Sequence, residues 1–360
     1  MPRISLILPL SIIFTAGALS AQSAPVVPAS AKPFAQPGTP GSPIDGQIFH
    51  AQVLLSSAGF SPGVIDGRKG QSLTEALRGF QEANGLQITG KLDGPTRQAL
   101  LTILRPSTVM VKLGPDDVKS TYVYPLPKDP DKQYKIPFLG YRNMLEKVAE
   151  RYHTTPRVVV SLNGPDKLIG LGQVLRLPNV IPSSRDYKGS LDKGAYLMNL
   201  LNVDALQPRG SYIVIDKSEG ALKVFNGPAP SDDEEESGDS RGGQLVAQFP
   251  VTIGSTHDPL PIGNWKVTTF SFLPPFHYQP DLFWDAKDTS EEHRLAPGPN
   301  GPVGVAWLDL TKEHYGIHGT PEPSTIGKTE SHGCIRMTNW DVMRLVGIMM
   351  KPGFQAKFQA

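Results

Sequence analysis

Cysteine is nearly absent from this chain, since Cys334 is the only one among 360 residues. A single thiol excludes an intramolecular disulfide, so no loop of the fold is closed by one. In an extracytoplasmic protein, an odd thiol is buried and inert, bonded to another molecule, or kept reactive. Which of these applies to Cys334 is the main question that the sequence raises.

The sequence also lacks an excess of charge of either sign. Its 35 lysines and arginines balance its 34 aspartates and glutamates, and this composition gives no support to a nucleic-acid partner. The local exception is residues 231–243, which hold six acidic residues and one basic residue. Such a run stays solvated and lacks the spacing of a calcium-binding loop, so we expect an exposed loop.

A long apolar run is missing everywhere except at the N-terminus. There, Arg3 precedes an apolar stretch that ends near Ala18, and small residues follow it. This layout is typical of a signal peptide, predicted here for residues 1–21, and it is too short for a good membrane anchor. An uncleaved anchor is the alternative. We therefore expect secretion to the periplasm or cell envelope, with no transmembrane segment in the mature chain.

The region after the signal peptide divides into a linker and a small helical module. Residues 22–45 are rich in proline, alanine, glycine and serine, which is typical of a flexible linker. Residues 46–103 contain apolar patterns at helical spacing, separated by turn residues. The pieces "GFSPGVIDG", "ALRGFQEANGL" and "TGKLDGPT" resemble the peptidoglycan-binding domain 1 family. That resemblance implies an all-α, three-helix cell-wall module; a generic helical bundle is the alternative.

Residues 119–181 resemble the second half of a LysM domain. The stretch "LEKVAERYHTTPRVVVSLNG" precedes "LIGLGQVLRLPN", and the resemblance implies a small α+β unit of βααβ order that binds glycan. The opening Gly-Asp-Thr strand of that family is absent, and we expect "STYVYPL" to take its place. Residues 182–208 contain one short helical pattern and are predicted to be a linker.

From residue 209 the sequence changes to short alternating strands with glycine and proline between them. The stretch "SYIVIDKSEGALKVFNG", for example, alternates apolar residues on both sides of a turn, which predicts a hairpin. Residues 209–340 are therefore predicted to form a β-rich mixed domain, and residues 341–360 a C-terminal tail.

Three chemically active side chains lie close together near the end of this domain: His318, His332 and Cys334. Histidine and cysteine are zinc ligands, but the stretch has neither a second cysteine nor a His-x-x-x-His pair, which disfavours a metal site. Gly333 permits unusual backbone conformations, and nearby histidine and arginine favour a thiolate, which disfavours an inert buried thiol. The residues therefore favour a nucleophile over these two alternatives.

A cysteine nucleophile needs a base for its proton and donors for the oxyanion that it creates. His318 is the better candidate for the base, because it comes from a separate segment and can approach the sulfur from the side. His332 is so near Cys334 that on an extended backbone its side chain points elsewhere. The amides of His332, Gly333 and Cys334 can converge at a tight turn as oxyanion donors.

At this point the sequence is similar to a known catalytic family. The stretch "HGTPEPSTIGKTESHGCIRM" resembles the signature of the L,D-transpeptidase (YkuD) family, and "LPIGNWKV" and "PGPNGPVGVAWLDL" resemble its upstream segments. The resemblance implies that Cys334 is the nucleophile and His318 the proton acceptor and donor. It also implies that the Gly319 carbonyl orients the imidazole. Arg336 is expected to position the substrate or structure the loop. Ser331 is the other candidate for substrate binding, and it is expected to stabilise the turn rather than to take part in the chemistry.

The resemblance implies a cysteine acyltransferase that acts on peptidoglycan stem peptides and glycan, with no cofactor and no metal. Cys334 would form a thioester with one stem peptide and pass it to an amine of a second stem, an envelope lipoprotein or an outer-membrane protein. An L,D-carboxypeptidase of the same family and a non-catalytic peptidoglycan-binding protein are the alternatives. The expected fold is multidomain, with a three-helix module, a LysM-like α+β region and a β-rich mixed catalytic domain.

Overall fold

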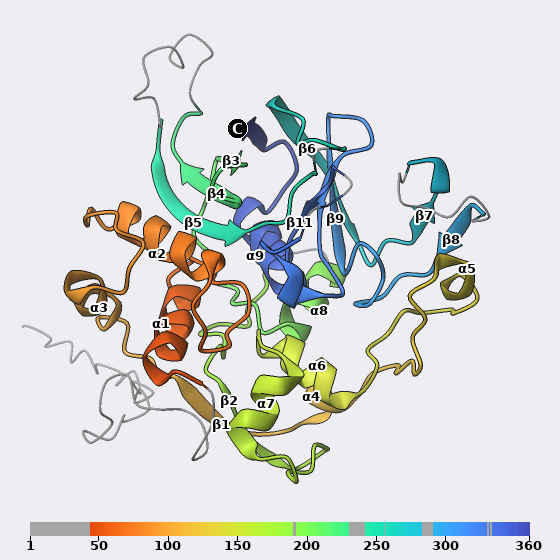
Figure 1. Ribbon diagram of the computed structural model, residues 1–360, viewed down its shortest axis with the longest axis horizontal. Coiled ribbons are helices and arrows are strands. Elements are labelled where there is room, and N and C mark those ends of the chain that lie inside the picture. Colours follow the sequence, from red (N-terminus) through yellow and green to blue (C-terminus); the bar gives the residue numbers. More distant parts are fainter. Residues whose placement is uncertain are drawn as a thin grey trace, which may run out of the picture. The chain divides into compact units, whose positions relative to one another are not determined.

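The computed structural model describes residues 44–189, 192–229, 242–255, 257–282, 291–329, 331 and 333–360 (Figure 1). The predicted signal peptide at 1–21, nearly all of the predicted linker at 22–45 and most of the acidic segment at 231–243 lie outside the described residues. Within the described ranges, no helix is both long enough and apolar enough to cross a membrane.

The N-terminal module consists of three helices, α1 (Gly46–Ser57), α2 (Gln71–Ala83) and α3 (Gly94–Leu100). Two carboxylates cap helix N-termini: Asp45 accepts hydrogen bonds from the first backbone N–H groups of α1, and Asp93 does so for α3. The apolar faces of the helices meet in one cluster that includes Leu54, Leu77 and Phe80. The prediction of a small helical module is confirmed.

The middle region is built on a two-stranded antiparallel sheet of β1 (Thr108–Lys112) and β2 (Val174–Pro178). Four helices lie between these strands in the sequence: α4 (Pro115–Val118), α5 (Pro130–Gln133), α6 (Met144–Arg151) and α7 (Pro156–Asn163). The opening strand lies before the predicted range of 119–181. The stretch "STYVYPL" forms only an isolated bridge, between Tyr122 and Tyr141, so its prediction as the opening strand is wrong.

The segment at 182–208 is packed and does not have the character of a linker. It contains α8 (Asp192–Leu200). Leu197, Met198, Leu201 and Val203 are buried in the main core of the next domain. These apolar residues follow the helix pattern seen in the sequence, and the burial of their side chains fixes the segment against the sheet.

An eight-stranded mixed sheet organises the rest of the chain, in the order β11-β10-β9-β6-β12-β3-β4-β5. Its strands are β3 (Tyr212–Asp216), β4 (Ala221–Asn226), β5 (Gln244–Pro250), β6 (Gly263–Phe272), β9 (Ala306–Leu310), β10 (Gly316–His318), β11 (Ile335–Arg336) and β12 (Gln355–Gln359). Only the pairs β12–β3 and β10–β11 are parallel. A separate pair joins β7 (Phe276–Tyr278) to β8 (His293–Leu295). Two short 3-10 turns, η2 (Pro280–Leu282) and η3 (Pro323–Thr325), complete the domain. The β-rich prediction is confirmed.

The last twenty residues are part of this domain. Helix α9 (Asn339–Met349) is buried along nearly its whole length, and β12 lies between β6 and β3 inside the sheet. Trp340 and Phe358 are each 1% exposed in the core cluster. The prediction of a tail at 341–360 is wrong, because the apolar positions of α9 and β12 fill the centre of the domain.

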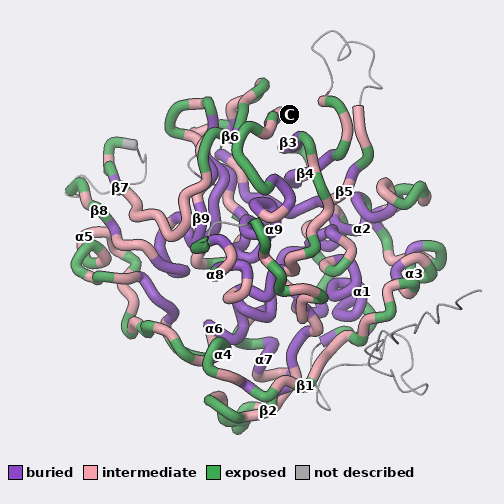
Figure 2. Tube along the Cα trace, turned by 180° about the vertical axis from the view of Figure 1, so that it is seen from behind, coloured by how far each residue is buried: buried purple, intermediate pink, exposed green. Residues whose placement is uncertain are grey.

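The helical module and the sheet share a core. Tyr212, Phe225 and Leu245 of the sheet pack in the same cluster as the module's helices. The Ser61 hydroxyl donates a hydrogen bond of 2.7 Å to the Asp341 carboxylate of α9, and the Ser61 N–H donates one of 2.8 Å to the Gln248 carbonyl of β5. Figure 2 shows buried segments along α1 and around α9. The module is therefore docked on the eight-stranded sheet.

The position of β12 predicts a stability effect at Phe358. Replacing Phe358 by alanine removes a ring that is 1% exposed, so we expect the free energy of unfolding in urea to fall by about 3–5 kcal/mol. Gln355→Ala, at an exposed position of the same strand, should change it by no more than about 0.5 kcal/mol. Equal effects of the two substitutions would contradict the interior placement of β12.

Candidate active site

A cavity of about 950 Å³ opens beside β10 and β11. Cys334, His318 and Arg336 all line it, together with Trp307 and Tyr315. The structure therefore brings together three of the residues predicted from sequence, and it adds two aromatic rings that the sequence analysis did not select.

The pairing of β10 with β11 explains why these side chains share one cavity. The strands run parallel, and His318 lies opposite Arg336. Cys334 lies directly before β11, two residues before Arg336, and lines the same cavity as His318. Sixteen positions separate His318 from Cys334 in the sequence, but the pairing of β10 with β11 brings both residues to one cavity.

His318 is buried, and its ring is held on two sides. A carbonyl only accepts hydrogen bonds, so the contact of 2.7 Å between Nδ1 and the Gly319 oxygen places the proton on Nδ1 and leaves Nε2 as the acceptor. The Trp307 ring stacks on the imidazole, with centroids 5.3 Å apart and planes 18° apart. Burial, with a smaller effect from the Arg336 charge, lowers the pKa of His318 to about 3. The ring is therefore neutral at neutral pH.

Gly316 makes room for this stack. A Cβ atom at position 316 would lie 2.4 Å from Cζ2 of the Trp307 indole, far inside any tolerable contact. Trp307 lies opposite His318 in the β9–β10 ladder. In the sequence, Trp307 is marked only by the strand pattern "GVAWLDL". This pattern does not predict that the indole stacks on His318.

The Cys334 thiol donates a weak hydrogen bond to the His314 carbonyl, with Sγ and oxygen 3.8 Å apart. Burial raises the pKa of the thiol above its ordinary value; the backbone of Gly316 and the charge of Arg336 lower it without cancelling that rise. The Arg336 charge therefore acts in the predicted direction, toward the thiolate, but burial outweighs it and the resting sulfur carries its proton at neutral pH.

The turn before Cys334 is constrained by its backbone and by one hydroxyl. Gly333 has a φ of 97°, in the region that favours glycine, and a Cβ there would lie 2.9 Å from the Tyr315 ring. The buried Ser331 hydroxyl donates a hydrogen bond of 2.6 Å to the Cys334 carbonyl. Ser331 thus stabilises the turn. His332 lies outside the described residues.

Arg336 is half-buried and anchored by its backbone. Its N–H donates to the Thr252 carbonyl at 2.8 Å, and the Thr252 N–H donates to the Arg336 carbonyl at 3.0 Å. Its charge lowers the pKa of both His318 and Cys334, so it lies close to both groups. Of the described side chains, no three of His, Cys, Asp and Glu are grouped to hold a metal ion.

A further layer of contacts ties the histidine strand to the middle region. The Asn339 side chain fits between Gly304 and Gly319, where an added Cβ would lie 2.0 and 2.1 Å from its Oδ1 atom. That oxygen accepts a hydrogen bond of 3.1 Å from the Val305 N–H, and Nδ2 donates one of 2.8 Å to Glu150 of α6. Burial raises the pKa of Glu150 to about 7, against the opposing effect of its hydrogen bonds.

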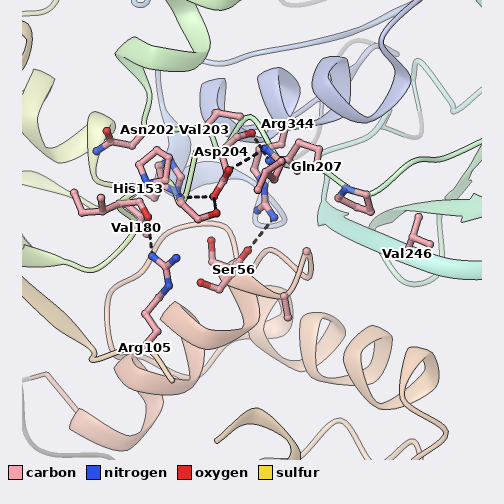
Figure 3. A pocket seen from close by; sticks show the side chains of 18 residues that line it. Ser56, Arg105, His153, Val180, Asn202, Val203, Asp204, Gln207, Val246 and Arg344 are labelled. Carbon is pink, nitrogen blue, oxygen red and sulfur yellow. Dashed lines mark hydrogen bonds between the residues drawn. The ribbon is translucent and has the colours of Figure 1, made fainter. Parts of the chain in front are cut away.

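A second cavity, of about 240 Å³, lies where the helical module, the middle region and α9 meet (Figure 3). Arg344 borders it and donates a hydrogen bond of 2.9 Å to the Ser56 carbonyl, and it forms an ion pair of 3.4 Å with Asp341. The His153 ring bonds the Leu201 carbonyl at 2.7 Å. These groups hold the modules together, and none of the predicted site residues borders this cavity. We therefore place the candidate site in the larger one.

Comparison with known families agrees with this placement. Residues 210–352 match the family described as "L,D-transpeptidase catalytic domain", and residues 45–100 match the one described as "Putative peptidoglycan binding domain". The first range contains the whole wall formed by β9, β10 and β11. The second coincides with the three-helix module.

Individual relatives cover smaller parts of the chain. A Bacillus licheniformis protein named "Putative L,D-transpeptidase YkuD" is 60% identical over 106 residues, which are 29% of this chain and 49% of that protein. A Bacillus subtilis protein named "Putative L,D-transpeptidase YqjB" is 29% identical over 143 residues, 38% of this chain and 65% of that protein. The chain thus spans about half the length of the first relative. The solved L,D-transpeptidase from Xylanimonas cellulosilytica is 14% identical, with a TM-score of 0.34 over 91% of this chain and 98% of that one; this weak likeness carries no conclusion.

The protonated resting thiol predicts how Cys334 reacts with iodoacetamide. Because only the thiolate attacks, and burial raises the thiol pKa, we expect the alkylation rate to keep rising up to about pH 9. The rate is measured by the mass of the intact protein, and Cys334→Ser, which has no thiol, gives the background. A rate that levels off below pH 7 would contradict a protonated resting sulfur.

Glu150 predicts a pH dependence of stability. Its carboxyl loses its proton near pH 4.5 when unfolded but near pH 7 when folded, so the folded state binds more protons between these values. The free energy of unfolding therefore falls as pH rises through this window. Glu150→Gln should remove this fall. Its free energy of unfolding should therefore rise by about 3 kcal/mol relative to that of the wild type as the pH increases from 4 to 8. The control is Glu313→Gln, at an exposed position, whose free energy of unfolding should depend on pH as that of the wild type does. A wild-type pH dependence in Glu150→Gln would refute the prediction.

Proposed function

We propose that the chain is a cell-wall L,D-transpeptidase, because residues 210–352 match the L,D-transpeptidase catalytic domain family and residues 45–100 match a peptidoglycan-binding domain family. The observation that carries the proposal is that His318 of β10 and Cys334, directly before the paired strand β11, line one cavity. A neutral imidazole whose Nδ1–H is held by the Gly319 carbonyl presents Nε2 as a base.

The first half-reaction is acylation of the cysteine. The Cys334 sulfur attacks the carbonyl carbon of the L,D-peptide bond before a terminal D-amino acid, and its proton passes to Nε2 of His318. The tetrahedral intermediate then collapses, the C–N bond breaks, and His318 returns the proton to the amine of the departing residue. Because the resting thiol is protonated, proton removal accompanies substrate binding and attack.

The intermediate needs donors for its oxyanion. The amides of His332, Gly333 and Cys334 are proposed to supply them. The positive φ of Gly333 and the hydrogen bond from the Ser331 hydroxyl to the Cys334 carbonyl define the conformation of this turn. Ser331 is engaged with the Cys334 carbonyl, so we assign it to the turn. Arg336 is the charged group of this wall that is near both reacting side chains, and we assign it to positioning the substrate.

The second half-reaction passes the acyl group to an amine. An uncharged amine attacks the thioester, the C–S bond breaks, and the amine proton returns through His318 to the sulfur. The acceptor is proposed to be a side-chain amine of a second stem peptide, which cross-links the wall; an amine of an envelope lipoprotein or outer-membrane protein would anchor that protein instead. Water as acceptor would give an L,D-carboxypeptidase.

The non-catalytic modules are proposed to hold the enzyme on its polymer in the periplasm or cell envelope. The helical module belongs to a peptidoglycan-binding family. The β1-α6-α7-β2 order of the middle region supports a LysM-like unit that binds glycan. Both modules raise the effective concentration of stem peptides at the active site.

A mass-spectrometric assay with a disaccharide-tetrapeptide tests the proposal. Transpeptidation yields a cross-linked dimer and a free D-amino acid, whereas a carboxypeptidase yields only the tripeptide form. We expect Cys334→Ala to abolish turnover while binding to isolated cell walls persists. His318→Gln should lower the rate by about 100- to 10,000-fold. Turnover that survives in Cys334→Ala, or no conversion by the wild type, would overturn the proposed mechanism.

A further inference from the structure

The middle region contains a segment that reaches the catalytic cleft. Residues 126–142, which we name the strap, run between α4 and α6 and include α5. Figure 1 shows α5 beside β8, at the outer side of the catalytic domain. The strap therefore leaves the β1-α6-α7-β2 unit and joins another domain.

A small core and a polar contact fasten the strap to the pair β7–β8. Leu139 of the strap is buried with Tyr278 and Leu295 of these strands. The Tyr134 ring stacks on His293, with centroids 4.2 Å apart and planes 7° apart. The same His293 ring contacts the Asp131 carboxylate at 2.8 Å, so α5 holds one histidine of β8 on two sides.

Backbone hydrogen bonds fix the far end of the strap. The Leu139 N–H donates to the Pro297 carbonyl at 2.9 Å, and the Asn300 N–H donates to the Leu139 carbonyl at 3.0 Å. The approach is so close that a Cβ at Gly298 would lie 2.1 Å from the Leu139 oxygen. The Asn300 side chain also donates to the Gly140 carbonyl at 3.0 Å. A segment fixed in this way keeps its position relative to the cleft.

One side of the strap forms a wall of the cavity that holds Cys334. The strap residues that line it are Leu126, Pro127, Lys128, Pro130, Gln133 and Arg142. The active site is thus enclosed by two modules, and the middle region supplies part of the surface that a substrate meets.

The two cationic side chains of this wall, Arg142 and Lys128, differ in whether they have an acidic partner. Arg142 forms ion pairs with Glu146 and with Glu322, the latter at 2.9 Å. Lys128 is exposed, and its side chain forms no ion pair or hydrogen bond within the part of the chain that the structure describes. An ammonium group on a flexible stem is a suitable partner for a carboxylate, and a stem peptide with a terminal D-amino acid carries one.

We propose that Lys128 is a specificity-determining residue, which binds a carboxylate of the donor stem peptide and so makes the middle region part of donor recognition. This inference rests on the proposed function for the identity of the donor. Lys128 is assigned to binding and not to the reacting atoms, because the thiol and the imidazole belong to Cys334, directly before β11, and to His318 of β10.

Binding measured without turnover tests the inference separately from the reaction. Calorimetric titration of Cys334→Ala with a tetrapeptide donor gives a reference Kd, and adding Lys128→Gln should raise that Kd about 5-fold. Lys128→Glu should raise it further. The matched control is Lys132→Gln, which removes the same charge from an exposed strap position that does not line the cavity and should leave the Kd unchanged.

Amidated donors identify the carboxylate. One donor carries a carboxamide at its terminal D-residue and another carries amides on its side-chain carboxylates; the donor that lacks the recognised carboxylate should bind equally with and without Lys128→Gln. If Cys334→Ala and its Lys128 variants bind every donor with the same Kd, the inference is overturned, whatever the enzyme's activity. A Lys128 effect on Kd in a chain whose wild type shows no turnover would overturn the proposed function and leave the inference standing.

Discussion

Helix α9 is buried on nearly all sides, so each of its polar side chains needs a partner inside the protein. Two other parts of the chain, the helical module and the middle region, supply these partners. Asp341 accepts from Ser61 of the helical module, Asn339 donates to Glu150 of the middle region, and the carbonyl of Ser56 accepts from Arg344. An unpaired polar group at any of these positions would cost about 1–3 kcal/mol. The hydrogen bonds that pair the polar groups of α9 therefore fix the helical module and the middle region against the eight-stranded sheet.

The same requirement reaches the active site. The oxygen of Asn339 occupies the space that two glycines leave, and Gly319 is the residue whose carbonyl holds the His318 ring. The imidazole is thus oriented by a backbone group that is itself packed against α9. The strap of the middle region lines the same cavity. Contacts between modules consequently shape both the surroundings of His318 and the wall of the cavity that holds Cys334.

Local patterns were a good guide to some features and a poor one to others. The stretch around "SHGC" predicted Cys334 and the histidine of "YGIHGT" predicted His318, and the parallel pairing of β10 with β11 brings these two residues to one cavity. The tail prediction failed because β12 enters the sheet between β6 and β3, and no local pattern marks a strand that crosses to the interior. The opening strand of the middle region, "TVMVK", lies before residue 119, where the predicted region begins, and its five residues carry no motif of that family.

By itself the sequence determined the chemical types present: one thiol, a histidine in a glycine-bounded strand, and a small helical module ahead of a β-rich domain. These depend on motifs of a few adjacent residues. Only the tertiary structure decided the protonation of Cys334 and His318, because burial sets both pKa values and burial comes from distant segments. It also decided that Trp307 stacks on His318, that Glu150 of the middle region bonds Asn339 of α9, and that Lys128 lines the cavity that holds Cys334. Each of these contacts joins residues that are not neighbours in the sequence, so no local pattern predicts it.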